Sequence, residues 1–358
     1  MSSEAVPGAG ANPGERERSH ASTRHALRIA GGIAVPFVVG EALGWDLPFI
    51  ASILAVLMLA GNQPPPKPAV AIASVLGIAI AFFAAVVLTR ISLPHPMVFV
   101  SVLGLAVFGG LYAQLRSASP VWFFFLIAVT VTPLMAAHSE ELASGVAGTM
   151  VAGMVVAILT VWLVHALWPQ PAAGPASAKS APENARSARE ALRIALAGTF
   201  IMIPLVLFLL SNKSAALVVA VTALSILRTA GFAQGKRAVL GILLGNVIAG
   251  GVAIVAYFMI DTAGSLLMLA AVILAVGLFF GERMANGGQS APLYAGACTA
   301  TIVLLGLGLS PFNDASTAFA TRVIYVVLAS AYTLALLALL TSLYPGPRSQ
   351  AAQVGKAS

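Results

Sequence analysis

The sequence predicts an all-α integral membrane protein with about twelve transmembrane helices, arranged as two parallel six-helix repeats. Composition is the first observation behind this prediction. Of the 358 residues, 59% are apolar and only 9% are charged, whereas an average soluble domain carries roughly 25% charged residues. The second observation is that apolar segments run along the whole chain, with a mean hydropathy of +0.96. The third is that basic residues recur in short clusters between these segments. Such a chain has too little polar surface to coat a soluble globule.

The first half of the chain predicts a tail followed by six membrane spans. Residues 1–24 combine several Pro and Gly with mixed charge, which predicts a disordered tail. A helix that crosses about 30 Å of hydrocarbon needs roughly 20 mostly apolar residues. On that basis residues 25–168 form the first repeat, and its predicted spans are Leu27–Leu43, Pro48–Ala60, Ala69–Leu88, Met97–Tyr112, Val121–Ala137 and Leu142–Leu167.

The second half repeats this arrangement. A linker over residues 169–188, rich in Pro, Ala and Ser, precedes a second repeat over residues 189–345, and a tail over residues 346–358 follows it. The predicted spans of the second repeat are Ala191–Leu210, Ser214–Leu227, Ala238–Ile260, Ala263–Phe280, Ala291–Leu309 and Ala318–Leu343.

The basic residues predict the orientation of these spans. Cytoplasmic loops keep an excess of Lys and Arg during membrane insertion. With the amino terminus inside, only Arg90, Lys213 and Arg322 of the 19 basic residues lie outside. We therefore expect a bacterial inner-membrane protein whose termini and central linker are cytoplasmic.

Two sequence matches indicate that the halves are repeats. Residues 24–30 read Arg-His-Ala-Leu-Arg-Ile-Ala, and residues 189–195 read Arg-Glu-Ala-Leu-Arg-Ile-Ala. Further along, Gly110 and Arg116 have the same spacing as Gly277 and Arg283. An even number of spans in each half makes the repeats parallel. The second span of each half is also short, about 20 Å long at 1.5 Å per residue. Short segments at corresponding positions are typical of the central site of a transporter, although helix ends missed by the boundaries would give the same pattern.

Several other classes of function are excluded by missing motifs. The glycines of Gly231–Arg237 are too close together for a phosphate-binding loop, and the segment carries Arg in place of Ser or Thr. The five histidines show no metal-ligand spacing, and the single Cys298 lies in an apolar stretch. The basic residues form no stripe with interleaved aromatics that would indicate nucleic-acid binding. We expect no enzymatic activity, no metal and no cofactor.

Four arginines are candidate substrate-binding residues. Arg28 and Arg193 lie at the start of the first helix of each half, and Arg116 and Arg283 are paired by the repeat. A guanidinium group presents a fork of donors that matches a carboxylate. The alternative is that each arginine anchors its helix by extending to the lipid headgroups.

Four further residues are candidates for proton coupling. Glu41 and Asp46 lie at the outer end of the first span, and His138 and Glu140 lie in the outer turn between the fifth and sixth spans. Carboxylates and imidazoles at a membrane boundary can exchange protons in the useful pH range. Solvated loop residues would have the same sequence pattern.

The chain also resembles the fusaric acid resistance and aromatic acid exporter superfamily, in particular its short bacterial inner-membrane branch. The similar segments are residues 24–30 with Glu41–Trp45, and the basic pair Lys236 and Arg237 followed by Gly241 and Gly245. The resemblance implies a six-plus-six helical fold and efflux of aromatic or related organic acids alongside a periplasmic adaptor protein. Longer members carry a large soluble domain between the halves, and here the linker has only about 20 residues.

Together, these features predict an inner-membrane efflux transporter for small organic, mainly aromatic, carboxylates that is driven by protons. Its partners would be the organic anion, membrane lipid, the adaptor protein and further copies of the chain in a homo-oligomer. The competing hypothesis is a non-transporting membrane scaffold subunit of an envelope or adaptor complex. An uncoupled channel is a third.

Overall fold

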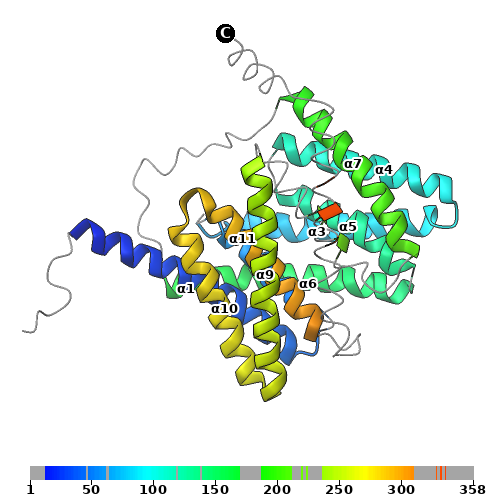
Figure 1. The fold of residues 1–358 in the computed structure, drawn as a ribbon. Coiled ribbons are helices and arrows are strands. Elements are labelled where there is room, and N and C mark those ends of the chain that lie inside the picture. Colours follow the sequence, from blue (N-terminus) through cyan, green and yellow to red (C-terminus); the bar gives the residue numbers. More distant parts are fainter. Residues whose placement is uncertain are drawn as a thin grey trace, which may run out of the picture.

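The computed structural model describes residues 13–45, 47–61, 64–117, 120–137, 139–169, 187–211 and 236–309, with isolated positions at 219–220, 223–224, 328, 331, 332 and 335. All the regular elements in this part of the chain are helices (Figure 1). They are α1 (Pro13–Ala42), α2 (Phe49–Leu59), α3 (Pro68–Ser92), α4 (Pro96–Ser117), α5 (Pro120–Ala136), α6 (Glu140–Leu167), α7 (Ala188–Ser211), α9 (Lys236–Ala263), α10 (Leu266–Asn286), the 3-10 helix η3 (Gly288–Ser290) and α11 (Ala291–Leu309).

Six of the described helices are long and apolar enough to cross a membrane. They are α3, α4, α6, α7, α10 and the part of α9 from Leu244 to Ala263, and α2, α5 and α11 are shorter apolar helices. The outer faces of the long helices carry exposed large apolar side chains such as Ile80, Phe200 and Phe258, which hydrocarbon covers in a bilayer. The described part of the chain is therefore all helical, and the protein is a multi-pass membrane protein.

The structure differs from the predicted layout at the amino-terminal end, and it does not describe two of the predicted spans. The helix α1 begins at Pro13, so residues 13–24 are helical where the sequence predicted a disordered tail. Proline at the first helical position and the acidic Glu15 and Glu17 in the first turns favour a helix start there. The spans predicted over residues 214–227 and 318–343 lie almost entirely outside the described residues.

The helices α1 and α10 pack antiparallel at very short range. A Cβ atom added at Gly281 would lie 2.8 Å from the carbonyl oxygen of Ala26, and one at Gly277 would lie 2.6 Å from Cα of Ala30. Small residues four apart on both helices thus allow the two backbones to touch, as in other membrane helix pairs. At the end of the pair, Ser22 Oγ donates a hydrogen bond of 2.8 Å to Asn286 Oδ1.

The short helix α2 lies at the centre of the bundle. Eight of its side chains are buried, and it packs against α1, α6 and α11. Each of these neighbours places a glycine against it: Gly32 faces Leu59, Gly153 faces Ile50 and Ala51, and Gly306 faces Phe49. Its Ser52 hydroxyl donates a hydrogen bond of 2.8 Å to the carbonyl oxygen of Ile33 on α1. Because α2 has only 11 residues, it is about 16 Å long and cannot cross the hydrocarbon alone.

The same packing pattern occurs twice in the described helices. In the first half α5 packs against both α3 and α4, and in the second half α11 packs against both α9 and α10. Between the two halves of the chain, α1 packs on α10 and α7 packs on α4. Figure 1 shows the α1–α10 pair on one side of the molecule and the α4–α7 pair on the other.

Candidate anion site at the contact of α1 and α6

A buried arginine lies where the last turn of α6 packs against α1. Arg28 is only 2% exposed. Its neighbour Gly31 lets α6 approach, since a Cβ atom there would lie 3.1 Å from Val164 and 3.3 Å from the ring of Trp168. The close contact of the two helices therefore covers the guanidinium group with protein, whereas a snorkelling anchor extends its charged end toward water.

The hydrogen-bond partners of Arg28 are electrically neutral. Its Nη1 atom lies 3.4 Å from Nε2 of His165, and its Nε atom donates to the carbonyl oxygen of Arg24 at 3.4 Å. Nδ1 of His165 lies 2.8 Å from the carbonyl oxygen of Val161. A carbonyl can only accept, so Nδ1 carries the proton and Nε2 offers a lone pair to Arg28. This assignment describes a neutral imidazole.

In the described part of the chain, no carboxylate lies within salt-bridge distance of Arg28; the ion pair found there joins Arg90 and Glu140. The two hydrogen bonds of Arg28 are long for N–H donors. Most of its five N–H groups therefore have no acceptor in these residues. A buried charge without an opposite charge costs several kcal/mol, on the order of the penalty for a broken buried ion pair. An anion is the ligand that would lower this cost.

The other three predicted arginines are exposed. Arg193 lies on an exposed face of α7, and α7 packs on α4 and α5, whereas α1 packs on α2, α6 and α10. Arg116 is exposed at the end of α4. Arg283 is exposed at the end of α10, with its guanidinium carbon 5.1 Å from the ring centre of Phe279 and 5.9 Å from that of Tyr294. The four arginines thus occupy different environments, and Arg28 is the buried one.

The proton-coupling candidates that the structure describes are Glu41 and Glu140. Glu41 is half-buried in the last turn of α1. Glu140 begins α6 and forms an ion pair of 3.2 Å with Arg90, in which both side chains are more than 70% exposed. Asp46 and His138 lie outside the described residues. No group of three potential metal ligands occurs among the residues that were described.

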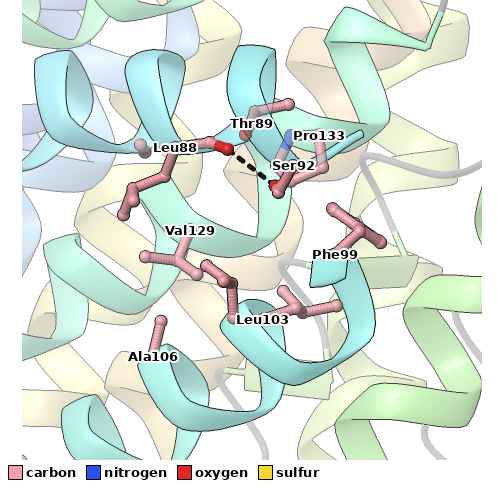
Figure 2. Close-up of a pocket in the computed structure, with 10 residues that line it drawn as sticks. Leu88, Thr89, Ser92, Phe99, Leu103, Ala106, Val129 and Pro133 are labelled. Carbon is pink, nitrogen blue, oxygen red and sulfur yellow. Dashed lines mark hydrogen bonds between the residues drawn. The ribbon is translucent and has the colours of Figure 1, made fainter. Parts of the chain in front are cut away.

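Two cavities lie between the described helices. The first, of about 20 Å³, is closed by α3, α4 and α5 (Figure 2). Its polar groups are Thr89 and Ser92, and Ser92 Oγ donates to the carbonyl oxygen of Leu88. The second, of about 440 Å³, is a groove between α9 and α10. Neither cavity is lined by Arg28.

Sequence reasoning missed His165 as a partner of Arg28. The signal was present as a lone histidine in the last apolar turn of the sixth predicted span, where an imidazole needs a hydrogen-bond partner. Two further polar groups were not foreseen: the hydroxyls of Thr130 and Thr132 on α5 are buried and lack a hydrogen-bond partner.

Comparison with known families gives one match. The family model described as "Protein of unknown function (DUF2955)" matches residues 25–164, a range that runs from α1 to the last turns of α6. No curated protein and no solved structure matches the chain. The matched range includes Arg28 and ends one residue before His165. The resemblance to the aromatic acid exporter superfamily stays a prediction.

Proposed function

We propose that this protein is a proton-driven exporter of small organic, mainly aromatic, carboxylates in the bacterial inner membrane. The observation that carries the proposal is the Arg28 guanidinium, 2% exposed and held by neutral acceptors. A permanently bound structural anion would also be explained by a buried arginine with neutral partners. The multi-pass helical architecture and the resemblance to aromatic acid exporters favour an anion in transit.

The proposal assigns the carboxylate of the substrate to Arg28. A planar guanidinium group binds a carboxylate through two parallel hydrogen bonds. His165 keeps the arginine in place when the site is empty, because its neutral Nε2 atom accepts from Nη1. The proposed cycle needs reversible binding of the anion. The carboxylate of the substrate would replace Nε2 of His165 as the acceptor for Arg28 on uptake, and His165 would replace the carboxylate on release.

The proposed architecture is a twelve-helix bundle of two parallel repeats with both termini in the cytoplasm. It is supported by the paired contacts of α1 with α10 and of α7 with α4, and by the similar packing of α5 and α11 within their halves. The family match, over residues 25–164, also ends near the bounds predicted for the first repeat.

Cysteine labelling tests this topology. Cys298 is the single cysteine of the chain and is buried, so an impermeant thiol reagent reports on introduced residues. We expect Ser180→Cys and Ser349→Cys to react only after the cytoplasmic side is exposed. Reaction of either variant in intact cells would contradict the six-plus-six arrangement.

Transport into inverted membrane vesicles tests the function. Vesicles that contain the protein should accumulate labelled benzoate above the level of vesicles without it, and an ionophore that abolishes the pH gradient should reduce the accumulation. An absence of flux, with normal protein levels, would favour the scaffold hypothesis. Flux that does not depend on the pH gradient would favour the hypothesis of an uncoupled channel.

The Arg28 variants connect the activity to the site. Arg28→Gln should weaken apparent affinity by about 1.5–3 kcal/mol, or roughly ten- to a hundredfold, because a charge-assisted hydrogen bond is lost. Arg28→Lys should recover it only in part, since an ammonium group lacks the planar fork. Arg189→Gln, at an exposed position of α7, is the matched control. An unchanged half-saturation concentration in Arg28→Gln vesicles would remove this site from the mechanism.

A further inference from the structure

The groove between α9 and α10 has the dimensions and surface of a site for a hydrocarbon chain. Its volume is about 440 Å³, within the range of roughly 300–1,000 Å³ that ligand pockets occupy. The lining is entirely apolar or glycine: Gly251, Val252, Val255, Ala256 and Met259 from α9, and Met268, Ala271, Val272, Ala275, Val276 and Phe279 from α10. Among the described residues that line it there is no hydroxyl, amide or charged side chain, so its occupant presents an apolar body to these helices.

Charge is located at one end of this groove. Phe279 is a lining residue, and the guanidinium carbon of Arg283, one turn further along α10, lies 5.1 Å from the centre of its ring. The ring centre of Tyr294, at the start of α11, lies 5.9 Å from the same guanidinium carbon. Contacts of a cation with two aromatic faces fix the position of Arg283 while leaving its N–H groups available. The groove therefore offers an apolar channel that ends at a positioned positive charge.

The corresponding position in the first half of the chain is closed. There α5 contributes Val129 and Pro133 to the space between α3 and α4, and a cavity of only about 20 Å³ remains (Figure 2). The groove of the second half is lined by α9 and α10 alone. Of these two cavities, the one between α9 and α10 is the larger.

We propose that this groove binds an anionic phospholipid, with an acyl chain between α9 and α10 and the phosphate on Arg283. The side chains beside the groove are those of a lipid-facing surface, since Val255 and Phe258 on α9 are both more than 60% exposed. Arg283 lies in the last turn of α10, and the ends of transmembrane helices are where basic side chains meet lipid headgroups. Basic positions between transmembrane helices on the cytoplasmic side are suited to phosphate headgroups. Glu282 is the adjacent position, about 100° around the helix from Arg283, so the two side chains leave the helix in different directions.

Lipid binding by the purified full-length protein tests this inference independently of transport. Phosphatidylglycerol and phosphatidylcholine with the same acyl chains would be added to protein in detergent, and retained lipid would be measured by native mass spectrometry. We expect the protein to retain phosphatidylglycerol preferentially. One guanidinium group at the headgroup is worth about 1 kcal/mol, so Arg283→Gln should reduce the preference about fivefold, and Arg283→Lys should keep most of it.

A second variant tests the apolar part of the site. A Cβ atom at Gly251 has no neighbour within 4 Å, so Gly251→Leu fills the groove without disturbing the backbone. It should reduce retention of both lipids. Gly109→Leu on α4, where a Cβ atom likewise meets nothing within 4 Å, and the exposed Arg189→Gln are the matched controls and should bind lipid as the unmodified protein does.

Four results would overturn the inference. One is an unchanged preference for phosphatidylglycerol in Arg283→Gln, and another is an equal loss in Arg189→Gln, which would indicate a general effect of surface charge. The third is unchanged retention of both lipids by the Gly251→Leu protein. If benzoate competes with the lipid for the groove, the occupant is the transported acid and the lipid assignment is wrong.

Discussion

Nε2 of His165 lies 3.4 Å from Nη1 of Arg28, while Nδ1 of the same ring lies 2.8 Å from the carbonyl oxygen of Val161. The carbonyl accepts from Nδ1–H, and the guanidinium group of Arg28 can only donate, so Nε2 accepts through its lone pair and the imidazole is neutral. The arginine is held by a partner that does not cancel its charge. This relationship between the two residues is the basis of the proposed anion site.

Removing the acceptor from His165 should destabilise the protein. His165→Leu leaves a donor of Arg28 without a partner in a buried place, which costs about 1–3 kcal/mol. His165→Gln keeps an acceptor oxygen and should lose much less. Thermal unfolding of the purified proteins in detergent measures the difference, and His95→Leu is the control because His95 is exposed. Equal stability of the Leu and Gln variants would mean that the 3.4 Å contact has no energetic role.

Benzoate should restore much of the stability of His165→Leu. A ligand that binds only the folded protein raises its melting temperature in proportion to the logarithm of its concentration. In this variant a carboxylate would supply the acceptor that Arg28 has lost. The same addition should have no effect on the double variant His165→Leu with Arg28→Gln. A rise of the same size in both proteins would place benzoate at a different site.

The central position of α2 depends on glycines of its neighbours. A Cβ atom at Gly153 on α6 would lie 3.1 Å from Ile50 and 3.5 Å from the backbone nitrogen of Ala51. Gly153→Val should therefore force α6 away from α2 and destabilise the protein by about 1–3 kcal/mol, as overpacking of a core does. Gly148→Val is the matched control on the same helix, because a Cβ atom there has no neighbour within 4 Å. The melting temperatures of the two variants should differ clearly.

The contact of α1 with α10 is closer still and involves backbone atoms on both sides. A Cβ atom at Gly281 would lie 2.8 Å from the carbonyl oxygen and 2.9 Å from Cα of Ala26. Gly281→Leu should separate the two helices and reduce both stability and the yield of folded protein. Gly296→Leu on α11, where the added atom has open space, should fold normally. A Gly281→Leu protein with unchanged stability would show that the helices do not pack this closely.

Much of the helical architecture could be predicted from the sequence, because hydrocarbon demands long apolar helices and few charges. The environments of the paired arginines could not. Arg28 and Arg193 follow the same Ala-Leu step, yet Arg28 is buried and Arg193 is exposed. Burial depends on which neighbouring helix covers a face, and α6 covers α1 at Arg28. A repeat in the sequence does not specify such contacts between distant helices.

The close contact of α1 with α10 could be predicted from the sequence only in part. Glycines at 277 and 281 have the spacing of a small-residue contact, and Ala26 and Ala30 have the same spacing. In the sequence, Gly277 also occupies the repeat position that corresponds to Gly110. In the structure Gly110 instead faces Phe125 and Leu126 of α5. The same motif therefore packs against a different partner in each half, because the helix beside it differs.

Glu41 and Glu140, the two described candidates for proton coupling, differ in their access to water. Glu140 is 71% exposed and paired with the exposed Arg90, an arrangement worth at most about 1 kcal/mol. Glu41 is half-buried in the last turn of α1. A coupling carboxyl group must be reached by protons from one side of the membrane at a time, and a side chain that contacts bulk water throughout cannot meet this condition. We therefore expect Glu140→Gln vesicles to accumulate benzoate with the normal dependence on the pH gradient, and Glu41→Gln vesicles to lose that dependence while still binding benzoate. Measuring accumulation with and without the ionophore for both variants checks this. Loss of coupling in Glu140→Gln alone would reverse the assignment and place the proton path at the outer end of α6.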